Sequence, residues 1–191
     1  FLLREVPFGN DGDFSHQALI NRLNGELAND FGNLAQRVLS MIAKNCGGAV
    51  PRPGTLTGDD ESLLGEVHGL LEKTRGNMDA QAFHEALAAI WTVIRACNVY
   101  IDRQAPWKLK TEDPERMATV LYVLAEAIRN LAILTSPFMP QSMDRMLDQL
   151  AIASDHRAFT FLGPGHALVA ATALPKPEGV FPRLADEGQG A

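Results

Sequence analysis

Apolar residues recur at alternating intervals of four and three positions in several separate stretches of this chain, and this spacing limits the folds it can adopt. One series consists of Leu27, Phe31, Leu34, Val38 and Met41. A longer series consists of Phe83, Leu87, Ile90, Ile94, Cys97 and Ile101. Such intervals place the apolar side chains on one face of an α-helix, and helices of this kind bury those faces against one another. The spacing predicts an all-α protein, folded as an antiparallel helical bundle.

Capping residues, glycines and prolines set the expected limits of these helices. Asp113 followed by Pro114 is a strong start signal, because a carboxylate caps free N–H groups and proline fits the first helical position. A helix is also expected to end before a residue that precedes proline. The expected helices run from Ser15 to Asn45 with a kink or break at Asn24-Gly25, over about 60–75, from a cap at Asp79 to just before Ala105-Pro106, from Pro114, and after Pro140.

The sequence divides into three parts. Residues 1–14 begin with an apolar, partly alternating stretch followed by Gly9-Asn10-Asp11-Gly12, which is typical of a strand and linker leaving an upstream domain. Residues 15–153 form the bundle. Residues 154–191 contain β-leaning pieces at 158–162 and 166–169 among prolines and glycines. We therefore expect a short irregular or β extension at the C-terminus, packing back on the surface of the bundle.

Charge and cysteine content exclude several classes of protein. The 191 residues carry a net charge of −6, which argues against bulk electrostatic binding of nucleic acid. Two local regions are nevertheless positive: residues 15–53 have four bases against two acids, and residues 91–111 have four against one. The two cysteines form no Cys-x-x-Cys pair, which excludes a disulfide framework and indicates a reducing, cytoplasmic compartment. No apolar run approaches 18 residues, so no membrane span is expected.

Signals of catalysis are missing from the chain. The five histidines lack metal-ligand spacing, and no glycine-rich phosphate loop or nucleophile elbow occurs. We predict no catalytic residue and no metal site.

The polar series Asn29-x-x-x-Asn33-x-x-x-Arg37 is the first candidate for a binding site. At 100° per residue the three side chains fall within an arc of about 80°, opposite the apolar face, and span about 12 Å. Ser40 and Lys44 project to the same side, and so does Arg22 if the helix continues through Gly25. Asparagine offers a donor and an acceptor and arginine a rigid donor fork, which suits the edge of an unstacked base. The alternative is the ordinary polar face of an amphipathic helix, although two asparagines within a helix are unfavourable.

The stretch from Arg103 to Lys110 is the second candidate. Trp107 follows Pro106 directly and has basic residues on both sides, Arg103 before it and Lys108 and Lys110 after it. A rigid indole beside positive charge is suited to stacking on a base near phosphates. The alternative is that Trp107 caps the core of the bundle.

Together these motifs resemble the C-terminal half of the methionyl-tRNA synthetase family. The resemblance rests mainly on two motifs, residues 27–37 and Asn98-Val99-Tyr100-Ile101-Asp102 with Ala105-Pro106-Trp107. In addition, residues 1–9 are similar to the last strand of the family's catalytic part, and residues 175–183 are similar to its closing peptide. The resemblance implies a bundle that binds the CAU anticodon of methionine tRNA. Asn33, Arg37 and Trp107 would then recognise the first anticodon base, a cytosine, with Asn29 and Pro106 in supporting positions. Lys44, Arg103, Lys108 and Lys110 are expected phosphate contacts, and Val99 departs from the basic residue that many members have.

The resemblance also implies what lies outside this chain. The family's catalytic motifs are missing, so ATP with magnesium, methionine and zinc are expected to bind elsewhere in a parent enzyme, and no cofactor is expected here. The implied partners are the anticodon stem-loop and the catalytic domain of the same polypeptide, with no membrane. No dimerisation module follows 186–191, so a monomer is expected. A helical scaffold for protein–protein contacts is the alternative function, and a complete enzyme is a weak third.

Overall fold

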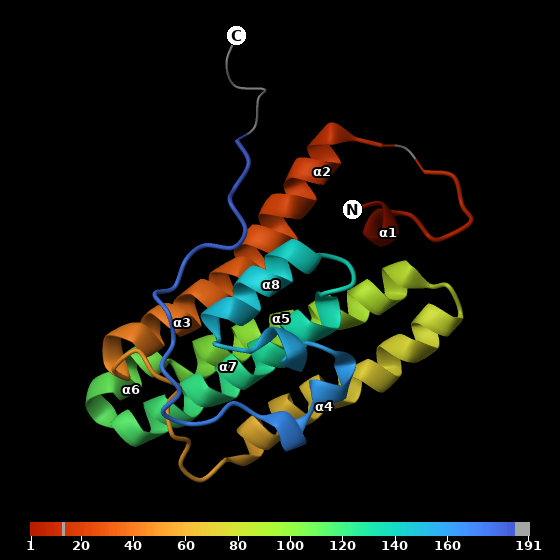
Figure 1. The fold of residues 1–191 in the computed structure, drawn as a ribbon. Helices are drawn as coiled ribbons and strands as arrows, with labels where there is room; N and C mark the ends of the chain where they lie inside the picture. Colours follow the sequence, from red (N-terminus) through yellow and green to blue (C-terminus); the bar gives the residue numbers. More distant parts are fainter. Residues whose placement is uncertain (13, 186–191) are drawn as a thin grey trace.

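A single long helix is the first major element of the computed structural model, which describes residues 1–12 and 14–185. It consists of α2 (His16–Arg22), η1 (Leu23–Gly32) and α3 (Asn33–Asn45), which follow one another without a gap. Figure 1 shows them as one diagonal rod. The pair Asn24-Gly25 does not break the helix, contrary to one of the two predicted outcomes. Instead the backbone of η1 is π-helical over ten residues.

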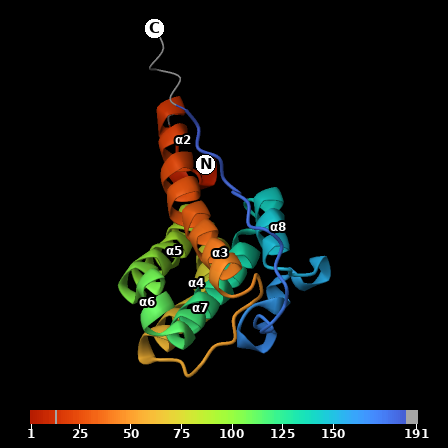
Figure 2. The ribbon, with the colours of Figure 1, turned by 90° about the vertical axis from the view of Figure 1, so that its left-hand side faces the viewer.

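Five further helices complete the bundle beside this rod. α4 (Gly58–Asp79) and α5 (Phe83–Gln104) form a hairpin, and the short α6 (Pro106–Glu112) leads into α7 (Pro114–Thr135), which runs back between them and α3 (Figures 1 and 2). α8 (Pro140–Gln149) packs against α7. The all-α antiparallel bundle predicted from the apolar spacing is confirmed.

Some of the helix ends predicted from the sequence are correct and others are wrong. Asp113 caps α7 as predicted, since its side chain accepts a hydrogen bond from the Arg116 N–H at 2.9 Å. Asp79, the predicted cap of the next helix, is instead the last residue of α4, and α5 begins only at Phe83. Residues 106–112 form a helix that the sequence did not indicate.

Helix α7 lies at the centre of the core. Its residues Val120, Leu121, Leu124 and Ile128 are fully buried. By length and composition alone α7 is long and apolar enough to cross a membrane, with a mean hydropathy of 1.6 over 18 residues, although charged residues such as Glu126 and Arg129 interrupt its apolar run. Of that window, 89% is buried inside the bundle, so the apolar length of α7 is explained by its contacts with the other helices.

The strand predicted at the N-terminus is wrong. Residues 2–5 form one turn of α-helix, α1 (Leu2–Glu5), in which the N–H groups of Arg4 and Glu5 both donate to the Phe1 carbonyl at 2.9 Å. A strand needs a neighbouring strand to satisfy its backbone groups, and none occurs among the described residues. Aromatic contacts hold the stretch after α1, with Phe8 edge-on to Phe83.

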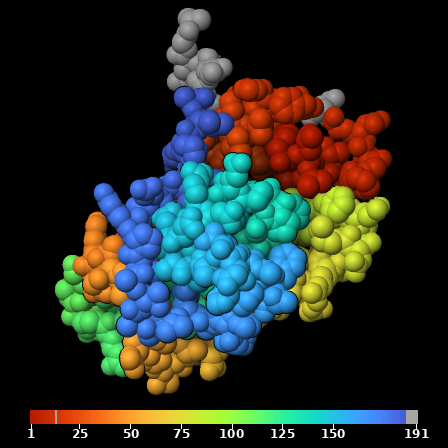
Figure 3. Space-filling model, in the orientation of Figure 1, coloured from red at the N-terminus to blue at the C-terminus, as the bar shows by residue number. Residues whose placement is uncertain are grey.

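The C-terminal segment has no strands either, among its described residues. The first β-leaning piece, 158–162, contains a 3₁₀ turn, η3 (Phe159–Phe161), and the second, 166–169, is irregular after the 3₁₀ turn η4 (Pro164–His166). A further 3₁₀ turn, η2 (Ser154–His156), precedes them, and one isolated bridge joins Ala173 to Ala49. Side chains of α7 take the backbone groups that a strand would pair: Arg129 donates to the Phe161 and Gly163 carbonyls, and Glu126 accepts from the Leu168 N–H. The segment packs back over the bundle (Figure 3) and continues along the long helix. The end of the predicted extension, 186–191, lies outside the described residues.

Candidate nucleic-acid interface

The three polar residues predicted from their spacing lie on the long helix, but not on one regular α-helix. Asn29 belongs to η1, whereas Asn33 is the first residue of α3 and Arg37 follows one turn later. The arc calculated at 100° per residue therefore holds from Asn33 onward and is wrong for Asn29, because a π-helix has more residues per turn. Asn29 and Asn33 are both exposed, and within the described chain the Asn33 side chain has no hydrogen-bond partner.

Arg37 and Trp107 lie against one another, although 70 residues separate them in sequence. The guanidinium carbon of Arg37 lies 5.4 Å from the centroid of the Trp107 ring. Its Nη2 donates to Asp102 Oδ1 at 2.8 Å, while its Nε and Nη1 have no partner within the described residues. The Asp102 carboxylate thus holds the guanidinium over the indole through Nη2 and leaves the N–H groups of Nε and Nη1 available.

The backbone around Trp107 explains how the indole is presented. α5 ends in a left-handed residue, Ala105, with φ 45° and ψ 57°, after which Pro106 starts α6. Pro106 is buried, while Trp107, next on the first turn, is 45% exposed. Part of the indole therefore remains accessible even with Arg37 over it, so Trp107 is not enclosed as a core cap would be.

The C-terminal segment contacts the same face of the long helix. The guanidinium of Arg183 donates to the side-chain oxygen of Asn29. Beside it, both amide atoms of Asn24 pair with the backbone of Leu184 at 2.9 Å. Phe181 packs near Phe31 with a ring-centroid distance of 6.5 Å. Residues 181–184 therefore border the candidate site.

The four cations expected to contact phosphate differ in whether an acid of the chain already pairs with them. Lys44, Lys108 and Lys110 are exposed and make no ion pair within the described part of the chain. Arg103 lies 3.4 Å from Asp59, although its side chain is 71% exposed. Lys108 and Lys110 share α6 with Trp107, so two of these cations belong to the element that carries the indole.

A buried ionic cluster supports the end of α5 from which this site extends. Asp60 of α4 is fully buried and accepts from the Tyr100 hydroxyl at 2.5 Å and from Arg116 of α7 at 2.5 and 2.7 Å. Arg116 also donates to Gln104, the last residue of α5, at 2.9 Å. Burial by itself would raise the pKa of Asp60, but the hydrogen bonds from Arg116, Tyr100 and the Thr57 backbone outweigh it and lower the pKa to about 2. Burial, followed by the hydrogen bond to Asp60, raises the pKa of Tyr100.

Two residues at the site were not identified from the sequence. Asp102, the partner of Arg37, is an acid on α5 five positions before Trp107, and its charge opposite to that of Arg37 was the available signal. Arg183 gave no such signal, because 154 residues separate it from Asn29. No group of three or more His, Cys, Asp or Glu side chains that could hold a metal ion occurs among residues 1–12 and 14–185.

The sequence of this chain is similar to those of known proteins. A family model described as the anticodon binding domain of methionyl tRNA ligase matches residues 50–191, and a model of class I tRNA synthetases (M) matches residues 1–39. A methionine–tRNA ligase of Mesorhizobium japonicum is 52% identical over 187 residues, covering 98% of this chain and 36% of that protein.

Solved structures give the same answer for the fold. Apo methionyl-tRNA synthetase of Mycobacterium tuberculosis superposes with a TM-score of 0.94 at 48% identity, covering 97% of this chain and 38% of that one. The same enzyme in complex with methionyl-adenylate gives 0.92 at 49% identity, covering 96% and 36%. The chain thus spans little more than a third of the length of the relatives it matches.

Proposed function

The chain belongs to the anticodon-binding domain family of methionyl-tRNA ligase, and from this premise we propose that it recognises the CAU anticodon of methionine tRNA through Asn33, Arg37 and Trp107. The observation that carries the proposal is the Arg37–Trp107 contact of 5.4 Å on a half-exposed indole. It brings a hydrogen-bonding fork and a stacking surface from two distant parts of the sequence to one place.

The chemistry of the three side chains suits cytosine as the first anticodon base. A base stacked on the accessible part of Trp107 would have its Watson–Crick edge beside Arg37. Cytosine has acceptors at O2 and N3, to which the remaining N–H groups of Arg37 can donate. Its N4 amino group can donate a hydrogen bond to the side-chain carbonyl of Asn33. Uracil has an N–H group where cytosine has the bare N3, so a donor of Arg37 would meet another donor. The site would reject uracil for that reason.

The supporting residues and the cations have separate roles in this proposal. Asn29 and Pro106 hold the two sides of the site, the first on the long helix and the second by starting α6. Lys44, Arg103, Lys108 and Lys110 would neutralise phosphates of the anticodon loop. Such contacts would contribute affinity and orientation without distinguishing one base from another.

The parent protein would be a methionine–tRNA ligase, which attaches methionine to its tRNA with ATP and magnesium in a catalytic part of the same polypeptide. The present residues lack a phosphate-binding loop and a metal-ligand cluster in their described part, so we assign no step of that reaction to them. We propose that this chain alone binds tRNA as a monomer in the cytoplasm without charging it. The family match does not favour the alternative of a protein–protein scaffold.

Binding of two RNA hairpins tests this function. A 17-nucleotide anticodon stem-loop with CAU is compared with one in which only the cytosine is replaced by uracil. We expect a preference for cytosine of roughly 5–150-fold, which corresponds to about 1–3 kcal/mol for one well-read base. Equal affinities for the two hairpins would contradict the proposal.

A further inference from the structure

The π-helical stretch η1 needs support from outside the helix. Hydrogen bonds from residue i to i+5 are rare and occur mostly as single turns, often at functional sites, whereas η1 extends over ten residues, Leu23–Gly32. Asn29 lies within it and Asn33 follows directly after it. The twist of η1 therefore sets the direction of these asparagines relative to Arg37, which lies on regular α-helix.

Two side chains of α5 hold backbone carbonyls inside this stretch. Trp91 Nε1 donates to the Glu26 carbonyl at 3.3 Å, and Asn98 Nδ2 donates to the Asp30 carbonyl at 3.0 Å. Because both donors come from one face of α5, seven residues apart, they fix η1 at two points along its length.

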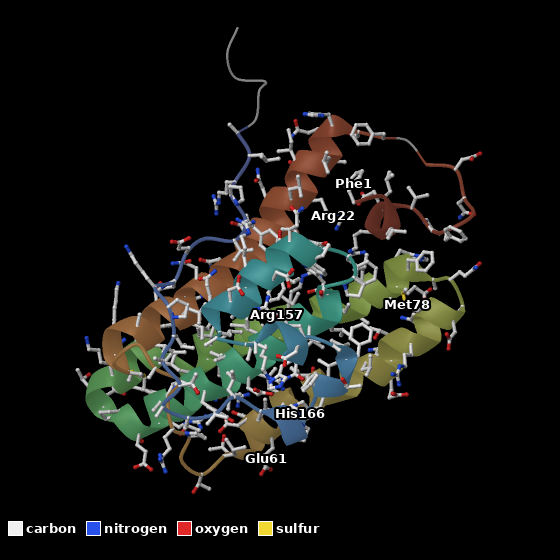
Figure 4. The ribbon with its side chains drawn as sticks, in the orientation of Figure 1. Phe1, Arg22, Glu61, Met78, Arg157 and His166 are labelled. Atoms are coloured by element: carbon white, nitrogen blue, oxygen red, sulfur yellow. The ribbon has the colours of Figure 1, made fainter. Side chains whose placement is uncertain are left out.

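The Glu26 side chain is the strongest of these supports. It is 7% exposed, and its Oε1 lies 3.0 Å from Arg4, 2.9 Å from Arg22 and 3.1 Å from Arg95. These arginines come from α1, α2 and α5, so one carboxylate of η1 joins three other elements. Figure 4 shows Arg22 beside Phe1, between the long helix and α1. Arg22 also pairs with Glu5 at 2.5 Å and Arg95 with Asp30 at 3.3 Å, whereas Arg4 pairs only with Glu26 within the described residues. Without the Glu26 carboxylate, Arg4 would lose its ion-pair partner, and the three arginines would share two acids instead of three.

We propose that Glu26 is a positioning residue for base recognition: its cluster with Arg4, Arg22 and Arg95 fixes the twist of η1 and thereby directs Asn29 and Asn33 toward the base held at Arg37 and Trp107. This inference rests on the proposed function. Glu26 is buried, so its effect on RNA passes through the helix. Neutralising it removes one negative charge, which by itself would strengthen binding of both hairpins alike.

The test compares Glu26→Gln with a matched control, Glu72→Gln, an exposed acid of α4 that pairs only with Arg75 within the described chain. The preference for the cytosine hairpin over the uracil hairpin is measured at a temperature where each variant is fully folded. We expect the preference to fall roughly 3–30-fold in Glu26→Gln, the usual range for a residue that acts without touching the ligand, and to stay unchanged in Glu72→Gln. Amide hydrogen exchange in 24–33 should become faster in Glu26→Gln only.

The possible results distinguish failure of the positioning role of Glu26 from failure of the proposed function. If the wild type shows no preference for cytosine, the proposed function fails. If the wild type shows the preference and Glu26→Gln keeps it within twofold, the positioning role is wrong. A lower preference without faster exchange in 24–33 would also overturn it, since the effect would then lie outside the helix. If Glu26→Gln does not fold, Trp91→Phe, which removes the donor to the Glu26 carbonyl and keeps an aromatic ring in the core, is judged by the same criteria.

Discussion

At the scale of single residues, Arg37 has three partners of different kinds: the Trp107 ring, the Asp102 carboxylate and, in our account, a cytosine. The carboxylate lies 2.8 Å from Nη2 and restricts the side chain before any RNA arrives. A restrained fork loses less conformational entropy on binding than a free one. This arrangement explains how an arginine whose side chain is only 31% exposed can distinguish bases instead of serving only as a charge.

Arg37→Ala should therefore reduce the preference for cytosine over uracil. Binding of the cytosine hairpin should weaken by about 1–3 kcal/mol. The uracil hairpin should lose less, because it makes no matched hydrogen bonds to the guanidinium. Affinities of both hairpins for both proteins, measured at one salt concentration, check this. Equal weakening of both would identify Arg37 as a phosphate contact and refute its role in recognising the base.

At the scale of elements, the Asp60 cluster ties three helices together at the end that carries the site. Asp60 lies on α4, Tyr100 on α5 and Arg116 on α7. Its pKa of about 2 in the folded protein is below the value of about 3.9 expected in the unfolded chain. The folded state thus keeps Asp60 ionised where the unfolded state binds a proton. The resulting stability is present above about pH 4 and is lost as the pH falls toward 2.

Asp60→Asn should lower the free energy of unfolding at pH 7, near the lower end of roughly 3–5 kcal/mol, because it leaves the partly exposed Arg116 without its charged partner. It should also flatten the fall in stability between pH 4 and 2. Denaturant unfolding at several pH values measures both effects, with Glu61→Gln, which changes an exposed acid next to Asp60 on α4, as the control. An unchanged acid profile in Asp60→Asn would show that other carboxylates account for the loss.

The helices show which features sequence can predict. Apolar spacing found the long helices because burial of one face dominates their stability, and Asp113-Pro114 located the start of α7 because the cap is local. α6 was missed because it depends on Ala105 in the left-handed region, a conformation that alanine seldom adopts. The turns at 159–166 were taken for β structure because their backbone partners are buried side chains of α7, about 33 residues away.

The candidate site divides in the same way. Asn29, Asn33, Arg37 and Trp107 could be predicted as candidates, since their residue types and local patterns were informative. Their mutual arrangement was not, because the π-helical twist of η1, the Arg37–Asp102 pair and the Arg183–Asn29 contact all depend on tertiary packing. Each of these three features depends on side chains from helices or segments that are distant in sequence.

At the scale of the whole molecule, a net charge of −6 coexists with a small positive region around α6. Four cations face solvent: Lys108 and Lys110 on α6, Lys44 on α3 and the partly paired Arg103 near the end of α5. Because each neutralised phosphate of a single strand contributes about −0.7 to the slope of log affinity against log salt, we expect a slope of about −2 to −3. Titrations of the CAU hairpin from 50 to 300 mM salt measure it. A slope near −6 would mean that a much larger basic surface contacts the RNA.

The most direct test of the account is Trp107→Ala, measured for both hairpin affinity and thermal stability, with Phe159→Ala as a control that removes another partly exposed aromatic ring. If the indole is the stacking surface for the anticodon cytosine, Trp107→Ala should lose about 1–3 kcal/mol of binding to the CAU hairpin with little change in melting temperature. Phe159→Ala should leave binding unchanged. A Trp107→Ala protein that binds the hairpin as tightly as the wild type, or that melts far lower and loses binding only as it unfolds, would contradict the account.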